Sequence, residues 1–124
     1  MLFGSCHCGA IRLEIARKPP QLTQLTQCNC SICRRYGALG AYYTRKSARV
    51  VCAAGTVAAY TWGNRAIELY HCTYCGCLTH YERSEKKHDD TRIAVNARML
   101  APEDIASVRV RHLDGAATWK YLDE

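Results

Sequence analysis

Cysteines at the spacing of metal ligands are the residues of this sequence best suited to chemistry. Nine cysteines occur in 124 residues, and seven of them fall into three compact groups. Two residues between ligands let both sulfurs converge on one ion, and a following glycine permits a backbone conformation that other residues resist. The three groups therefore predict metal binding. They are Cys6-His7-Cys8, Cys28-Asn29-Cys30-Ser31-Ile32-Cys33 and Cys72-Thr73-Tyr74-Cys75-Gly76.

Zinc is the metal that this composition favours. Thiolate-rich tetrahedral sites suit zinc or iron–sulfur clusters, and zinc is the commoner occupant at such spacings. An odd number of cysteines fits disulfide pairing poorly, and the amino terminus has neither the basic region nor the apolar run of an export signal. No apolar run approaches the length of a membrane span. We expect a cytoplasmic protein with reduced cysteines and no membrane partner.

Seven ligands divide most simply into four and three. A closed structural zinc site takes four protein ligands, whereas a reactive site keeps one position open. A triplet can reach one ion from a single turn, and a quartet from the first and last groups can clamp the first strand to a later hairpin. The triplet is Cys28, Cys30 and Cys33, and the quartet is Cys6, Cys8, Cys72 and Cys75.

The sequence leaves another division open. Cys77 could join Cys72 and Cys75 in a second triplet, which would leave Cys6 and Cys8 spare. We interpret Cys77 as structural, and Cys52 as a small buried hydrophobic residue.

Charge is distributed unevenly along the chain. Lys and Arg number 17 against 11 Asp and Glu, yet no acid occurs between Ile15 and Ile67, a stretch that includes the triplet. Such a block suggests an anionic partner, such as a carboxylate-bearing metabolite or a phosphate backbone. The alternative is that these basic residues form an ordinary solvated surface without a specific partner.

Short strands are the elements that must position these groups. Ile11–Ile15 alternates apolar and charged residues, as a half-buried strand does. A single helix start is evident at Ala101-Pro102-Glu103-Asp104, where proline and two acids occupy a first turn. We expect one mainly β, antiparallel domain over residues 1–124 with one short C-terminal helix, and an exposed loop at Glu82–Asp90. The other expected strands are Leu39–Arg45, Arg49–Cys52, Val57–Trp62, Ala66–His71, Leu78–Glu82, Arg92–Asn96 and Ser107–Leu113.

The order of these residues resembles a known family. Gly4-Ser5-Cys6-His7-Cys8-Gly9-Ala10, the stretch Cys28–Arg35, the Cys72–Gly76 knuckle, Ile93–Leu100 and Val110–Gly115 are similar to the family of the glutathione-dependent formaldehyde-activating enzyme and centromere protein V. The resemblance implies a β-tent-like zinc fold. It also implies two zinc ions per chain: a structural zinc on the quartet and a more labile catalytic zinc on the triplet. The implied activity is condensation of glutathione with formaldehyde to S-hydroxymethylglutathione, the reaction of a carbon–sulfur lyase.

Three thiolates make a zinc ion a weak Lewis acid, because the centre carries net negative charge. Binding a substrate thiol at the open position suits it better, since the ion lowers the thiol pKa. Such a thiolate could attack a small carbonyl compound, and the reverse step cleaves the C–S bond. Arg34 and Arg35, directly after the triplet, are candidates for contact with the carboxylates of glutathione. Asn96 and Arg98 receive no role beyond local hydrogen bonding, and the histidines show no defensible partner spacing.

Two hypotheses without catalysis are alternatives to the enzyme hypothesis. One is a zinc-stabilised basic module that binds nucleic acid or protein, and the other is a scaffold in which both metals are structural. Few aromatic residues lie within the basic block in a pattern suited to base stacking, so nucleic acid is not the expected partner.

Overall fold

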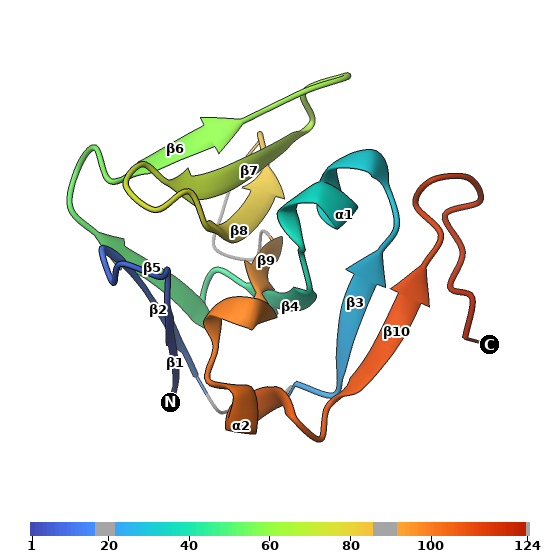
Figure 1. Ribbon diagram of the computed structural model, residues 1–124, viewed down its shortest axis with the longest axis horizontal. Helices are drawn as coiled ribbons and strands as arrows, with labels where there is room; N and C mark the ends of the chain where they lie inside the picture. The colour runs from blue at the N-terminus through green and yellow to red at the C-terminus, as the bar shows by residue number, and fades with distance from the viewer. Residues whose placement is uncertain (17–21, 86–91, 124) are drawn as a thin grey trace.

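Ten strands are the main secondary structure among the residues that the computed structural model describes, which are 1–16, 22–85 and 92–123 (Figure 1). The strands are β1 (Leu2–Ser5), β2 (Ile11–Ile15), β3 (Gln24–Cys28), β4 (Gly40–Thr44), β5 (Ala48–Cys52), β6 (Val57–Tyr60), β7 (Ile67–Cys72), β8 (Leu78–Arg83), β9 (Arg92–Asn96) and β10 (Arg109–Leu113).

Helices are few and short. They are α1 (Ser31–Tyr36), a 3₁₀ turn η1 (Ala97–Met99) and α2 (Pro102–Ile105). Pro102 opens α2, followed by Glu103 and Asp104 in its first turn, as the sequence predicts. Within the described ranges, no helix has the length and apolar character needed to cross a bilayer.

The expectation of a mainly β protein is confirmed, with two corrections. The prediction of a single, C-terminal helix is wrong, because the residues after Cys30 form α1 and not an open turn. The strands are not all antiparallel, because β10 pairs with β3 in parallel. Two strands, β1 and β3, went unpredicted, and their alternation is too short or too polar to be distinctive. The expected loop at Glu82–Asp90 begins within β8, which extends to Arg83, and its residues 86–90 lie outside the described residues.

The strands form two sheets. A small antiparallel sheet has the order β1-β2-β5, and a large sheet has the order β10-β3-β4-β9-β8-β7-β6. Figure 1 shows the small sheet at one side of the molecule and the β3–β10 pair at the other, with α1 between β3 and the β7–β8 hairpin. The parallel β3–β10 pair brings the last strand of the chain alongside Cys28, which lies opposite Leu113. The small sheet and the end of β7 carry the quartet, and the β3–α1 junction carries the triplet.

The main core lies between the two sheets. Leu13 and Ile15 of β2 pack with Ala41 of β4 and with Ile93 and Val95 of β9, all of them buried. A separate apolar cluster seats α1, because Ile32, Cys33 and Tyr36 pack against buried Ala38, Leu69 and Leu78. The triplet is therefore attached to the rigid β7–β8 part of the large sheet.

Asn96 ties three elements together at the end of β9. Its side chain is 2% exposed. Its Oδ1 accepts hydrogen bonds from the backbone N–H groups of Leu39 at 3.1 Å and Arg98 at 3.3 Å, and its Nδ2 donates to the carbonyl of Leu78 at 2.9 Å. The Asn96 amide thus holds the starts of β4 and β8 together, beside the apolar cluster on which α1 packs.

We expect Asn96→Ala to lower the free energy of unfolding of the zinc-loaded protein by about 3 kcal/mol, because it leaves buried backbone groups unsatisfied. Urea denaturation followed by circular dichroism measures the change. The matched control is Asn64→Ala, an exposed residue whose Oδ1 accepts only a local bond from the Ala66 N–H. A loss at Asn96 no larger than at Asn64 would show that this network is not a structural tie.

Candidate metal centres and the adjoining cavity

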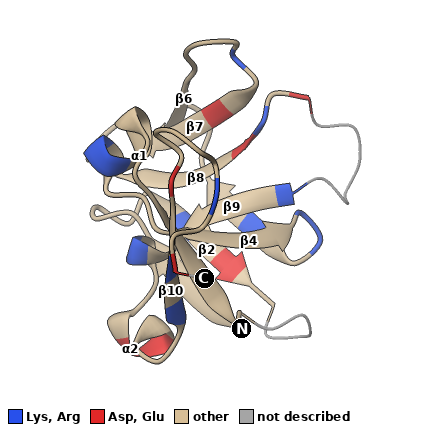
Figure 2. Cartoon of the chain, turned by 90° about the vertical axis from the view of Figure 1, so that its right-hand side faces the viewer, with Lys and Arg blue, Asp and Glu red and all other residues tan. Residues whose placement is uncertain are grey.

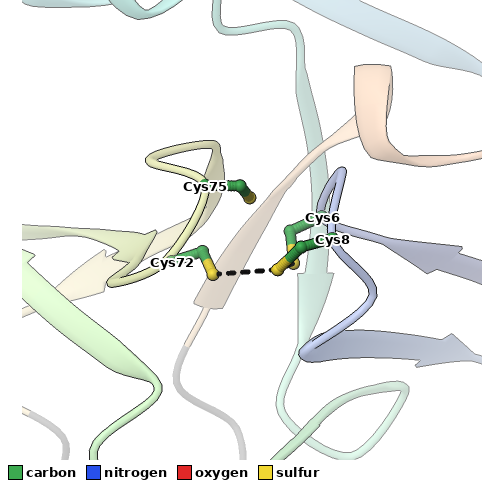
Figure 3. A group of neighbouring side chains, drawn as sticks. All are labelled: Cys6, Cys8, Cys72 and Cys75. Atoms are coloured by element: carbon green, nitrogen blue, oxygen red, sulfur yellow. Dashed lines mark hydrogen bonds between the residues drawn. The ribbon is translucent and has the colours of Figure 1, made fainter.

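The quartet is assembled from two loops that are far apart in the sequence. Cys6 and Cys8 follow β1 of the small sheet, whereas Cys72 and Cys75 lie at the end of β7 and in the turn before β8. Figure 3 shows the four sulfur atoms pointing toward one another across the gap between the loops. The Cys8 Sγ atom is 3.7 Å from Cys6 Sγ and 3.6 Å from Cys72 Sγ.

These separations fit a tetrahedral thiolate site. Zinc–sulfur bonds of about 2.3 Å place the sulfurs of a tetrahedron roughly 3.8 Å apart. All four sulfurs lie within 4.8 Å of one another, as metal ligands must. The donor set therefore suits one zinc ion with four protein ligands.

Backbone N–H groups surround the quartet sulfurs. The N–H of Ile11 donates to Cys6 Sγ at 3.3 Å, and that of Tyr74 donates to Cys72 Sγ at 3.4 Å. Backbone hydrogen bonds from Cys77 and Cys8 lower the pKa of the Cys75 thiol to about 5. Such donors stabilise thiolates, so the knuckle is prepared for a cation.

Gly76 closes the knuckle in the left-handed backbone region. Its φ is +77°, and its N–H donates to the carbonyl of Cys72 at 2.9 Å. A residue with a side chain would be strained there, as the sequence pattern indicates.

The two remaining cysteines lie beside the quartet without joining it. Cys77 and Cys52 are half-buried and pack against the cluster formed by Cys6, Ile11 and Cys72. The group of ligand atoms that converges at this point contains Cys6 and Cys8 and not Cys77, so the structure favours the quartet over the alternative second triplet.

The triplet spans the junction between β3 and α1. Cys28 ends β3, Cys30 caps α1, and Cys33 lies within the helix. Their sulfurs also lie within 4.8 Å of one another, and all three residues are half-buried. A C-x-C-x-x-C sequence thus converges because a strand turns directly into a helix, where residues three apart share a face.

The electrostatic surroundings of the triplet differ from those of the quartet. Burial raises the pKa of Cys33 and of Cys28. Burial also disfavours ionisation of Cys30, but hydrogen bonds from the backbone of Cys33 and Ile32 and from the Cys33 and Cys28 side chains together lower its pKa. The three thiols are half-buried, and the first turn of α1 contains no acidic residue. A divalent cation bound between the three sulfurs would stabilise their thiolate forms.

The loop after β10 passes directly over the triplet. A Cβ atom at Gly115 would lie 2.4 Å from Cys28 Sγ, so the backbone approaches the sulfur more closely than a larger residue permits without movement. Asn29 fixes this loop: its Nδ2 donates to Asp114 at 3.0 Å, and its Oδ1 accepts from the Ala116 N–H at 2.9 Å. The loop closes one side of the triplet.

A cavity of about 460 Å³ adjoins the other side. Cys28 and Cys33 are part of its wall, together with Arg34 and Arg98. Its volume falls within the range of about 300–1,000 Å³ that is common for small-molecule sites. The triplet is therefore accessible to a small ligand.

The arginines around this cavity are oriented differently. Arg98 donates from Nε to the carbonyl of Gly37 at 2.7 Å, which places its guanidinium at the end of α1. Arg35 donates to the carbonyl of Ser31 in its own helix at 2.8 Å and is not among the described residues that line the cavity. Of the two arginines predicted from sequence, the structure brings Arg34 to the cavity. Arg98 was missed because nothing in the sequence connects residue 98 with residues 28–34.

Two further residues of the cavity wall also escaped sequence analysis. His112 and Asp123 line it, and their side chains are in contact, with Nδ1 of His112 2.7 Å from Oδ2 of Asp123. The two residues are eleven positions apart in the sequence, so their contact exists only in the folded chain.

The larger cavity of the molecule lies elsewhere. It measures about 1230 Å³ and is lined by residues of β4 and β7–β9, including Tyr42, Tyr81, Glu82 and Arg92. Its described lining contains no cysteine. The chemistry of the triplet is therefore associated with the smaller cavity.

Among the described residues, basic and acidic residues are distributed over several elements. Figure 2 shows Lys and Arg on α1, β9 and β10, with acidic residues on β7 and α2. Arg17 and Lys18 of the acid-free stretch lie outside the described residues.

Comparisons with known proteins agree with this architecture. The family model described as "Glutathione-dependent formaldehyde-activating enzyme" matches residues 1–111. A solved structure of a Rhodobacter sphaeroides protein is similar, with a TM-score of 0.68 and 31% identity over 88% of this chain and 99% of that chain.

A curated relative is similar over a shorter stretch. It is a Halomonas elongata protein that carries the family's name, and it is 43% identical over 42 residues. That stretch is 34% of this chain and spans about a quarter, 26%, of the relative. The family model, by contrast, covers both cysteine groups. The chain therefore belongs to the glutathione-dependent formaldehyde-activating enzyme family.

Proposed function

We propose that this chain, acting as one domain over residues 1–124, is a zinc-dependent carbon–sulfur lyase that forms and cleaves adducts between glutathione or a similar thiol and formaldehyde or a small carbonyl compound. The observation that carries the proposal is the asymmetry of the two cysteine groups. The quartet offers four ligands in a closed arrangement, whereas the triplet offers three beside a cavity. Four ligands complete zinc, and three leave a position for a substrate.

The quartet would hold a structural zinc. Its ligands join the small sheet to the β7–β8 turn, and Cys6 and Cys72 are each 1% exposed. Little solvent reaches these two sulfurs, whereas Cys8 is exposed and Cys75 is half-buried. With all four ligands supplied by the protein, the role of the quartet would be to fix the sheets.

The triplet would hold the catalytic zinc. A zinc ion there supplies an open coordination position and lowers the pKa of a thiol that approaches it. The chain's own contribution is to orient Cys28, Cys30 and Cys33 from the β3–α1 junction and to close one side with the Gly115 loop. A substrate would therefore enter from the cavity side.

Arg34 and Arg98 give that cavity its preference for anions. Glutathione carries two carboxylates, and guanidinium groups can bind carboxylates in a bidentate geometry. Arg98 bonds the carbonyl of Gly37 through Nε, and its terminal nitrogens would bind a carboxylate. The two arginines would hold the carboxylates while the thiol reaches the triplet.

We expect the purified protein to bind close to two zinc ions per chain, with one removed readily by a mild chelator. The reason is that the triplet has three protein ligands beside a cavity and the quartet has four. Mass spectrometry of metal content before and after chelation measures this. Equal resistance of both ions would contradict an open triplet site.

Cys75→Ser and Cys33→Ser should separate the two sites. A structural zinc contributes on the order of 10 kcal/mol in small zinc domains, so Cys75→Ser should prevent folding. Cys33→Ser should leave a folded but inactive domain, measured by circular dichroism and by thiol–formaldehyde adduct exchange with several thiols. Absence of acceleration by the wild-type protein with every thiol would reject the enzyme. Unfolding of Cys33→Ser would instead favour a scaffold role.

Arg34→Ala should lower kcat/KM for glutathione about tenfold, mainly through KM, since an ionic hydrogen bond contributes about 1.5–3 kcal/mol. It should change little for 2-mercaptoethanol, which has no carboxylate. Arg35→Ala is the matched control, because its guanidinium bonds the helix backbone. Equal effects on both thiols would exclude carboxylate recognition by Arg34.

A further inference from the structure

The geometry points to His112 and Asp123 as a proton-transfer dyad for the cavity beside the triplet, with His112 accepting the substrate thiol's proton and returning it to the carbonyl oxygen. This inference rests on the proposed function. The supporting observation is that one cavity of about 460 Å³ includes Cys28, Cys33, His112 and Asp123 in its wall. The thiol chemistry and the histidine therefore share one space.

Asp123 fixes which nitrogen of His112 is available. Hydrogen bonds from the His112 side chain and backbone lower the pKa of Asp123, so this carboxyl group is ionised near neutral pH. An ionised carboxylate is only an acceptor, and Nδ1 of His112 must therefore donate to Oδ2 across 2.7 Å. In the neutral imidazole this leaves the lone pair on Nε2, the nitrogen that can take a proton. The same arrangement orients the histidine of Ser-His-Asp hydrolases.

The tail that carries Asp123 is held firmly against β10. The Leu122 N–H donates to the carbonyl of His112 at 2.8 Å. Tyr121 shares a hydroxyl hydrogen bond with Thr26 at 2.8 Å, and the guanidinium of Arg111 lies 3.8 Å from the centre of its ring. The His112 backbone N–H also donates to Oδ1 of Asp123. Several independent contacts thus hold the carboxylate in register with the imidazole, as a preorganised pair requires.

The side chain of His112 combines this anchoring with access. It is 51% exposed, and that of Asp123 is 26% exposed. Structural histidines such as His80 are buried, at 4% exposure. An anchored imidazole on the wall of a cavity is suited to exchanging protons with a bound molecule.

The proposed step balances as follows. The substrate S–H bond gives its proton to Nε2 of His112, and the sulfur electron pair forms the C–S bond to the carbonyl carbon. The C=O π pair moves to oxygen, and His112 returns the proton to that oxygen to give the hydroxyalkyl thioether. Cleavage is the reverse sequence. No oxidant, reductant or further reactant is needed, and Asp123 acts as a positioning residue that stays ionised.

Binding calorimetry tests the proton acceptor without relying on turnover. Glutathione is titrated into the zinc-loaded protein at pH 7.5, where imidazoles are mostly neutral and thiols mostly protonated. Buffers of different ionisation enthalpy report the protons released. Wild type should release close to none, because His112 keeps the proton, and His112→Ala should release about one per glutathione bound. The same release from both proteins would overturn the dyad.

Kinetics supplies the second measurement. His112→Ala should lower kcat for adduct formation about 100-fold, with zinc content and KM retained, and added imidazole should restore part of the rate. Asp123→Asn should lower kcat in the same direction with KM unchanged. Glu103→Gln on α2, an exposed carboxylate outside the cavity wall, is the control and should match wild type.

The outcomes separate the dyad from the function on which it rests. An active wild type with unchanged kcat in His112→Ala would overturn the dyad alone. A loss of activity that imidazole does not restore, accompanied by loss of zinc, would assign His112 a merely structural role and also overturn it. A wild type that neither binds glutathione nor accelerates adduct formation would overturn both.

Discussion

Mutual repulsion among thiolates is the constraint on which this structure depends. In the quartet, Cys8 Sγ lies 3.7 Å from Cys6 Sγ in the same loop and 3.6 Å from Cys72 Sγ of the other sheet, and ionised sulfurs at these distances repel one another unless a cation lies between them. The small sheet has three strands, and its contact with the large one runs through the core around Leu13 and Ile15 and through this cluster of sulfurs. A bound metal would convert the least favourable contact between the sheets into their strongest connection.

The protein surroundings of the two cysteine groups stabilise thiolates to different degrees. Around the quartet, backbone N–H groups of Ile11, Tyr74 and the knuckle point at the sulfurs. Around the triplet, burial works against ionisation of Cys28 and Cys33, and fewer backbone groups compensate. The first environment favours permanent coordination. The second leaves the sulfurs dependent on the ion, and it leaves the ion available to a further ligand from the cavity.

Sequence patterns predicted which cysteines converge, but they did not predict most of the cavity wall. The spacing of cysteines in C-x-C and C-x-x-C groups is a local feature, so it can be recognised in the sequence. The same holds for Gly76, whose left-handed backbone conformation the Cys72–Gly76 knuckle needs. The strand from Ile11 to Ile15 was predicted with its correct bounds because its alternation is strict. In contrast, α1 was missed because its six residues are too few to show a helical periodicity and its N-cap residue, Cys30, makes no side-chain capping hydrogen bond. Arg98, His112 and Asp123 reach the cavity through the β4–β9 and β3–β10 pairings, which no local pattern encodes.

The parallel pairing of β10 with β3 brings the last segment of the chain to the cavity, although this segment supplies no metal ligand. Residues 1–111, which match the family model, contain both sets of cysteine ligands. The segment that follows supplies Gly115 over Cys28 and the His112–Asp123 wall, yet contributes no ligand to either group. Substitutions in this terminal segment can reshape the cavity while the metal-binding framework stays intact. Relatives with equal metal content could in this way differ in the thiols they accept, and the tail is the region in which to look for that variation.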